Sequence, residues 1–124
     1  MTLKELYDAM GGDYEQAIKV LRIEKLIDKH IRKLPDNPIF GNLSEAGRTM
    51  DGKALFESSH AVKGVCANLG LVKMSACASD VAEQFRPGNS RTLSDGQVQE
   101  KVNEIGAMYE KCVEEINKYA QSLQ

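Results

Sequence analysis

Apolar residues recur at spacings of three and four along nearly the whole chain, and alternating apolar and polar runs bounded by turns are absent. Spacings of three and four place apolar side chains on one face of an α-helix. The sequence therefore predicts an all-α protein. We expect an antiparallel up-and-down four-helix bundle with an additional short N-terminal helix, formed by a single domain over residues 1–124.

Glycines, prolines and capping residues indicate where helices begin and end. A short helix is expected over 2–10 and a longer one over 13–34, with the Asp13 carboxylate as the N-cap and Pro35 at the end. Prolines and glycines interrupt the stretch 35–52, and its path is not predicted by the pattern.

Three further helices are expected in the rest of the chain. The first covers about 52–69. At Gly70, in a left-handed conformation, the chain reverses direction and enters an antiparallel helix over 72–86. The last helix begins at Ser94 or Asp95, either of which can serve as its N-cap. The helix over 52–69 buries a stripe that consists of Leu55, Ser59, Val62, Cys66 and Leu69.

The opposite face of that helix carries the candidate chemistry. His60, Lys63, Gly64 and Ala67 are three or four residues apart, so they share one exposed side, and the first three form a patch roughly 6 Å across. A neutral imidazole is a nucleophile, and a nearby ammonium group attracts the anionic group that the imidazole acquires. A glycine leaves space for another macromolecule. The alternative is an ordinary solvated histidine and lysine beside a helix defect that costs about 1 kcal/mol.

The order of these residues resembles the central motif of the histidine-containing phosphotransfer (HPt) family. His60 is followed by the apolar Val62, then by Lys63 and Gly64, and a second glycine, Gly70, comes six residues later. The resemblance implies a phosphorelay intermediate, which accepts a phosphoryl group from a receiver-domain aspartate and passes it to another receiver in a multistep two-component system.

The resemblance also implies roles for individual residues. His60 would be the phosphoacceptor, Lys63 would stabilise the phosphoryl group, and Gly64 would let a receiver approach the ring. Ala67 and Phe56 would extend the docking surface, although Phe56 can instead pack at the edge of the bundle.

Implied partners are response-regulator receiver domains and, in addition, a hybrid sensor histidine kinase. Magnesium is expected on the receiver, so no cofactor is expected on this chain. The sequence has neither a phosphate-binding loop nor magnesium ligands, which indicates a phosphocarrier without kinase activity rather than an enzyme. A monomer is expected, because one face must serve successive partners.

Composition narrows the choice of partners and compartment. The chain has 16 basic and 18 acidic residues and a formal charge of −2, which argues against nucleic-acid binding. No apolar run approaches the ~20 residues needed to span a bilayer, and the first residues lack a signal peptide's apolar stretch. We therefore expect a cytoplasmic protein. The three cysteines, Cys66, Cys77 and Cys112, are expected to be buried thiols.

Other functions remain open from the sequence. Glu57 and His60 form one Glu-x-x-His element of the kind that di-iron bundles use twice, but His30 is preceded by Ile27 at the matching position, so no metal site is expected. Glu57 either orients the His60 ring or is solvated, and His30 is either structural or exposed. The main alternative function is a non-transferring helical module that binds receivers or other signalling proteins. An enzyme with His60 as general base ranks third.

Overall fold

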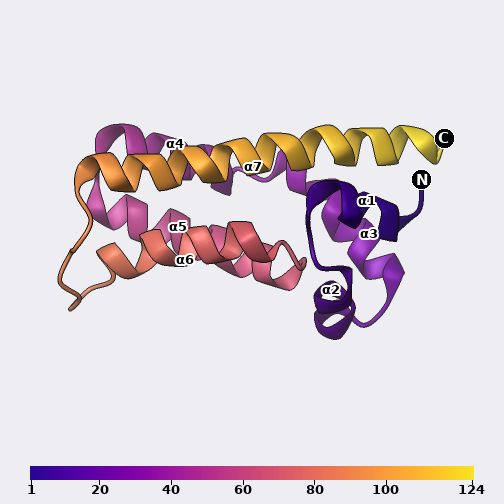
Figure 1. Ribbon diagram of the computed structural model, residues 1–124, viewed down its shortest axis with the longest axis horizontal. Helices are drawn as coiled ribbons and strands as arrows, with labels where there is room; N and C mark the ends of the chain where they lie inside the picture. The colour runs from indigo at the N-terminus through magenta and orange to yellow at the C-terminus, as the bar shows by residue number, and fades with distance from the viewer.

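The computed structural model describes residues 1–124 and contains helices without any strand (Figure 1). The all-α prediction is therefore confirmed. In chain order the elements are α1 (Leu3–Met10), α2 (Tyr14–Leu21), α3 (Glu24–Lys33), the 3-10 turn η1 (Leu34–Asp36), α4 (Ile39–Thr49), α5 (Gly52–Asn68), α6 (Val72–Phe85) and α7 (Asp95–Ser122).

The four C-terminal helices contact one another in a cycle. α5 packs against α4 and α6, and α7 packs against the same two helices from the other side. The three short N-terminal helices gather at the end of the molecule where α7 finishes and where both termini lie (Figure 1). All helices contribute to one continuous hydrophobic cluster, so the N-terminal helices and the cycle of α4–α7 share a core.

The single helix expected over 13–34 is wrong, because the chain turns at Arg22. Asp13 does cap α2, because its carboxylate accepts a hydrogen bond from the backbone N–H of Gln16 at 3.0 Å. Arg22 then adopts a φ of 75°, and α3 starts two residues later. α2 contacts α5, whereas α3 contacts α7, and the turn at Arg22 lets the chain reach both.

The stretch 35–52, whose path was not predicted, contains η1 and α4. α4 buries Phe40, Leu43 and Ala46 and lies between α5 and α7 in the cycle. A side chain at Gly47 would come within 3.0 Å of Val102, so glycine here permits close approach of α4 to α7. The helix that completes the cycle is therefore α4 rather than the one expected over 13–34.

The turn between α5 and α6 follows the prediction for Gly70. This glycine has a φ of 70°, and the Leu71 amide donates to the Cys66 carbonyl at 2.9 Å, which closes the end of α5. The Gly70 carbonyl also accepts a hydrogen bond from the Asp13 amide at 2.7 Å. The same turn therefore forms the α5–α6 hairpin and holds the start of α2.

The remaining boundaries and the cysteines also agree with expectation. Ser94 caps α7 through a capping box. Its hydroxyl accepts from the backbone N–H of Gln97 at 3.2 Å, and its own backbone N–H donates to Gln97 Oε1 at 2.9 Å. All three cysteines are free and buried. None of the helices has the combination of length and apolar character that crossing a membrane requires.

Candidate functional site

α5 separates its residues into a buried and an open side, as the spacing predicted. The Asp51 carboxylate caps the helix by accepting from the Lys53 and Ala54 amides at 3.1 and 3.2 Å. All five residues of the predicted stripe, Leu55, Ser59, Val62, Cys66 and the C-cap Leu69, are buried, and Ser58 is buried beside them. His60 is exposed, so the helix that anchors the core presents this imidazole to solvent.

Two buried serines precede His60 and are satisfied by the helix itself. The Ser58 hydroxyl donates to the Ala54 carbonyl at 2.6 Å, and the Ser59 hydroxyl donates to the Leu55 carbonyl at 2.5 Å. Hydrogen bonds of this kind cancel the cost of burying a hydroxyl. No buried side-chain polar atom in the protein lacks a partner, so the packed side of α5 behind His60 holds no polar group that calls for a ligand.

The His60 ring stacks on Phe56, one turn earlier on α5. The two ring centroids are 5.6 Å apart and the ring planes are inclined by 23°. Phe56 is half-buried, and the guanidinium of Arg86 lies 5.3 Å from its ring centroid. Of the two expectations for Phe56, packing at the edge of the helices describes its observed place.

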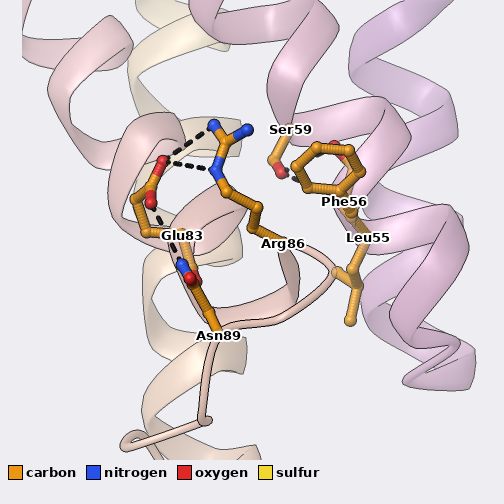
Figure 2. A network of polar contacts seen from close by, with 6 residues as sticks. All are labelled: Leu55, Phe56, Ser59, Glu83, Arg86 and Asn89. Atoms are coloured by element: carbon orange, nitrogen blue, oxygen red, sulfur yellow. Dashed lines mark hydrogen bonds and ion pairs between the residues drawn. The ribbon is translucent and has the colours of Figure 1, made fainter.

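Arg86 is held by residues at the end of α6. Its Nε and Nη2 donate to Glu83 Oε1 at 3.0 and 2.8 Å, and the side chain extends between Glu83 and the Phe56 ring (Figure 2). The Asn89 amide group donates to the Glu83 carbonyl at 2.9 Å and to the carboxylate at 3.2 Å. The hydrogen bond from Arg86 lowers the pKa of Glu83 and raises that of Arg86. Glu83 therefore stays ionised at neutral pH.

Lys63 is half-buried on the side of α5 that faces α6. Its backbone carbonyl accepts a hydrogen bond from the Ser75 hydroxyl at 3.1 Å. Its ammonium takes part in none of the salt bridges of the protein. After the larger effects of Arg86 and Asn89, the charge of Lys63 adds to the lowering of the Glu83 pKa. An unpaired cation thus lies one turn from His60.

Gly64 is exposed and has open space around it. A Cβ atom added at Gly64 would meet no heavy atom within 4 Å. Ala67, one turn further, is half-buried. The structure therefore places the four residues that were expected to share a face along one side of α5, with no packing reason for glycine at position 64. The expectation that this whole side is exposed holds for His60 and Gly64 only, because Lys63 and Ala67 are half-buried.

The two other candidates lie outside this group. Glu57 is exposed and pairs with Lys53 at 4.0 Å, so the solvated alternative describes it and it does not orient the His60 ring. His30 is exposed in the last turn of α3. No group of three or more histidine, cysteine, aspartate or glutamate side chains is placed to hold a metal ion.

Sequence reasoning missed Glu83, Arg86 and Asn89. Glu83 and Arg86 are three residues apart, which is the spacing of an ion pair within one helix, but nothing in that spacing indicates that the pair reaches Phe56. The contact crosses the α5–α6 hairpin, so only the expected antiparallel packing of those helices could have suggested it.

Comparisons with known proteins do not extend the picture. No protein-family model matches the chain, and neither the curated proteins nor the solved structures give a match. The features of the protein that bear on function are an exposed imidazole, an unpaired ammonium one turn away and an open glycine beside them.

Proposed function

We propose that this protein is an HPt-type phosphocarrier in a multistep two-component relay, with His60 as the phosphoacceptor. The observation that carries the proposal is the open glycine at position 64, one turn from the exposed imidazole. Glycine inside a helix costs about 1 kcal/mol relative to alanine. No neighbour within the protein requires it there. Gly41 in α4 and Gly106 in α7 are equally open, but only Gly64 lies one turn from an exposed histidine on the same helix. In this proposal the open space at Gly64 therefore serves a molecule that approaches His60 from outside.

The chemistry is a reversible transfer between two side chains. The lone pair of one His60 ring nitrogen attacks the phosphorus of an aspartyl phosphate on a receiver, a nitrogen–phosphorus bond forms, and the bond to the carboxylate oxygen breaks. The second ring nitrogen keeps its proton, and the aspartate leaves as a carboxylate. The reverse step delivers the phosphoryl group to another receiver. In this mechanism the Lys63 ammonium attracts the phosphoryl oxygens.

The partners in this proposal are receiver domains, including that of a hybrid sensor histidine kinase. Each receiver brings the aspartate and the magnesium ion, so this chain presents the histidine and needs no nucleotide. In this proposal we identify the cycle formed by α4–α7 with the antiparallel four-helix bundle that the resemblance implies, and we treat α1–α3 as additional helices at one end (Figure 1). In this proposal the protein acts in the cytoplasm. It acts as a monomer, because His60 must face successive partners.

Phosphotransfer from a receiver tests this function directly. The protein is incubated with a phosphorylated receiver and magnesium, and acid-labile, alkali-stable phosphate is measured on wild type, His60→Gln and His30→Gln. Both histidines are exposed on helices, which makes His30→Gln a matched control. We expect transfer to wild type and His30→Gln only. If a panel of receivers from the same genome binds the folded protein without transfer, the non-transferring interaction module replaces this proposal.

A further inference from the structure

We infer that Phe56 is a positioning residue for His60, fixed from the other helix of the hairpin by Arg86, Glu83 and Asn89. The inference rests on the proposed function, since it assigns the orientation of the phosphoacceptor ring. The relevant contacts are the Phe56–His60 stack, the guanidinium over Phe56 and the hydrogen bonds that hold that guanidinium.

The stack limits the orientations of an otherwise free ring. An exposed histidine on a helix has several staggered χ1 and χ2 combinations open to it. With its ring plane inclined by only 23° to Phe56 at a centroid distance of 5.6 Å, His60 keeps an orientation that retains this contact. In-line attack on phosphorus requires the reacting nitrogen to point at the donor, so a restricted ring spends more time ready to react.

Phe56 needs support of its own, because it is only half-buried at the edge of α5. The Arg86 guanidinium supplies this support at 5.3 Å from the ring centroid, a distance at which cations bind aromatic faces. Two hydrogen bonds to Glu83 fix the guanidinium, and the Asn89 amide fixes Glu83 (Figure 2). Residues at the end of α6 and in the loop that follows it therefore restrict the motion of the His60 ring through Phe56.

A different role for Arg86 would be to bind the phosphoryl group as a second cation once its ion pair with Glu83 breaks. In the structure its charge is already compensated by Glu83 and its face is occupied by Phe56, whereas Lys63 has no ion-pair partner. The two roles give opposite results for Glu83→Ala. Loss of support slows transfer, whereas release of a second cation speeds transfer and prolongs the life of the phosphohistidine.

The first readout is the environment of the His60 ring and needs no partner. The chain has two histidines, so a proton spectrum shows two sets of ring signals, and His60→Gln assigns them. We expect Phe56→Leu to move the His60 signals, because the ring current of the stack is lost, and to leave those of His30 in place. Phe56→Tyr should preserve the wild-type positions.

The matched control for Phe56 is Phe85. It is also half-buried and also lies under a guanidinium, that of Arg91 at 5.2 Å, but it does not stack on His60. Phe85→Leu should therefore leave the His60 ring signals and the transfer rate as in wild type. Thermal unfolding of each variant identifies any general loss of folding.

The second readout is the transfer rate at saturating receiver. We expect Phe56→Leu to lower it about tenfold, a modest part of what misplacement of a reacting group can cost, with Phe56→Tyr close to wild type. Half-saturation should change less than about twofold. If the receiver concentration that gives half the maximal rate rises while the maximal rate is unchanged, Phe56 is a docking contact and the inference is overturned. Unmoved His60 signals in Phe56→Leu, or faster transfer by Glu83→Ala, would also overturn it. Absence of transfer by wild type contradicts the proposed function instead, and the ring signals still test the stack.

Discussion

The backbone oxygen of Asp13 lies where the side chain of Gly70 would begin. A Cβ atom at Gly70 would overlap this carbonyl, and the residue has a φ of 70° that L-residues rarely adopt. The turn that joins α5 to α6 therefore also packs against the start of α2. This contact is possible only because Gly70 has no side chain.

Gly70→Ala is expected to destabilise the protein by at least about 3 kcal/mol, because it combines an unfavourable φ with a clash against backbone that cannot move aside. Chemical denaturation measures the change in the free energy of unfolding. Gly88→Ala is the control, since Gly88 has a φ of 92° but open space around it, and should lose only about 1–2 kcal/mol. Equal losses would show that the clash with Asp13 is relieved in the variant.

Gly64→Ala should stabilise the isolated protein by about 0.5–1 kcal/mol, because a helical glycine in open space is replaced by the best helix former. Gly64→Leu should leave the fold intact and obstruct the receiver, which lowers transfer from a phosphorylated receiver and weakens binding.

The control for position 64 is Gly106→Leu, since Gly106 is also helical with no neighbour within 4 Å but lies on α7. It should leave transfer unchanged. Normal transfer by folded Gly64→Leu would remove the clearance argument on which the proposed function rests.

Lys63→Ala should fold normally and reduce the rate of phosphohistidine formation or its lifetime by about tenfold, the order of one hydrogen bond to a charged group. The measurement is the time course of phosphate on His60 after mixing with a phosphorylated receiver. Lys53→Ala serves as control, because Lys53 lies on the same helix but pairs with Glu57 at 4.0 Å. Indistinguishable time courses for the two variants would exclude Lys63 from the mechanism.

The native cysteines should resist thiol reagents at pH 8. Burial raises the pKa of Cys66 to about 12 and those of Cys77 and Cys112 to about 11, so the reactive thiolate is scarce. An aromatic disulfide reagent should react slowly with the folded protein. After denaturation it should react rapidly with all three thiols.

These raised pKa values also set the sign of a stability change with pH. Unfolded cysteines lose their protons near pH 8.5, before the folded ones do, so the free energy of unfolding should fall as the pH rises from there toward the folded pKa values of about 11 to 12. Urea unfolding at pH 7.5 and pH 10 measures the difference. Fast labelling of native protein at pH 8 would contradict the burial of these thiols.

The open side of α5 could be predicted from sequence because it depends on local regularities. Spacings of three and four fix which residues share a helix face, and Gly70 marks the turn whatever the rest of the chain does. The exposure of His60 and the burial of Val62 follow from these regularities alone.

The parts that escaped prediction depend on contacts between distant segments. Arg22 turns the chain with a positive φ although neither glycine nor proline marks the place. Gly47 looks like a helix breaker in sequence but lies inside α4, where it lets that helix approach Val102. Arg86 reaches Phe56 only across the hairpin. In each case tertiary packing overrides what the local residues favour.

The division of α5 into two sides has a consequence for how such a protein can diversify. Substitutions on the stripe that contains Leu55 and Val62 disturb the core, so few would be tolerated. Around Gly64 a new side chain displaces nothing within the protein. Under the proposed function, substitutions on this open side would therefore alter partner recognition alone, while the scaffold that carries the histidine is inherited intact.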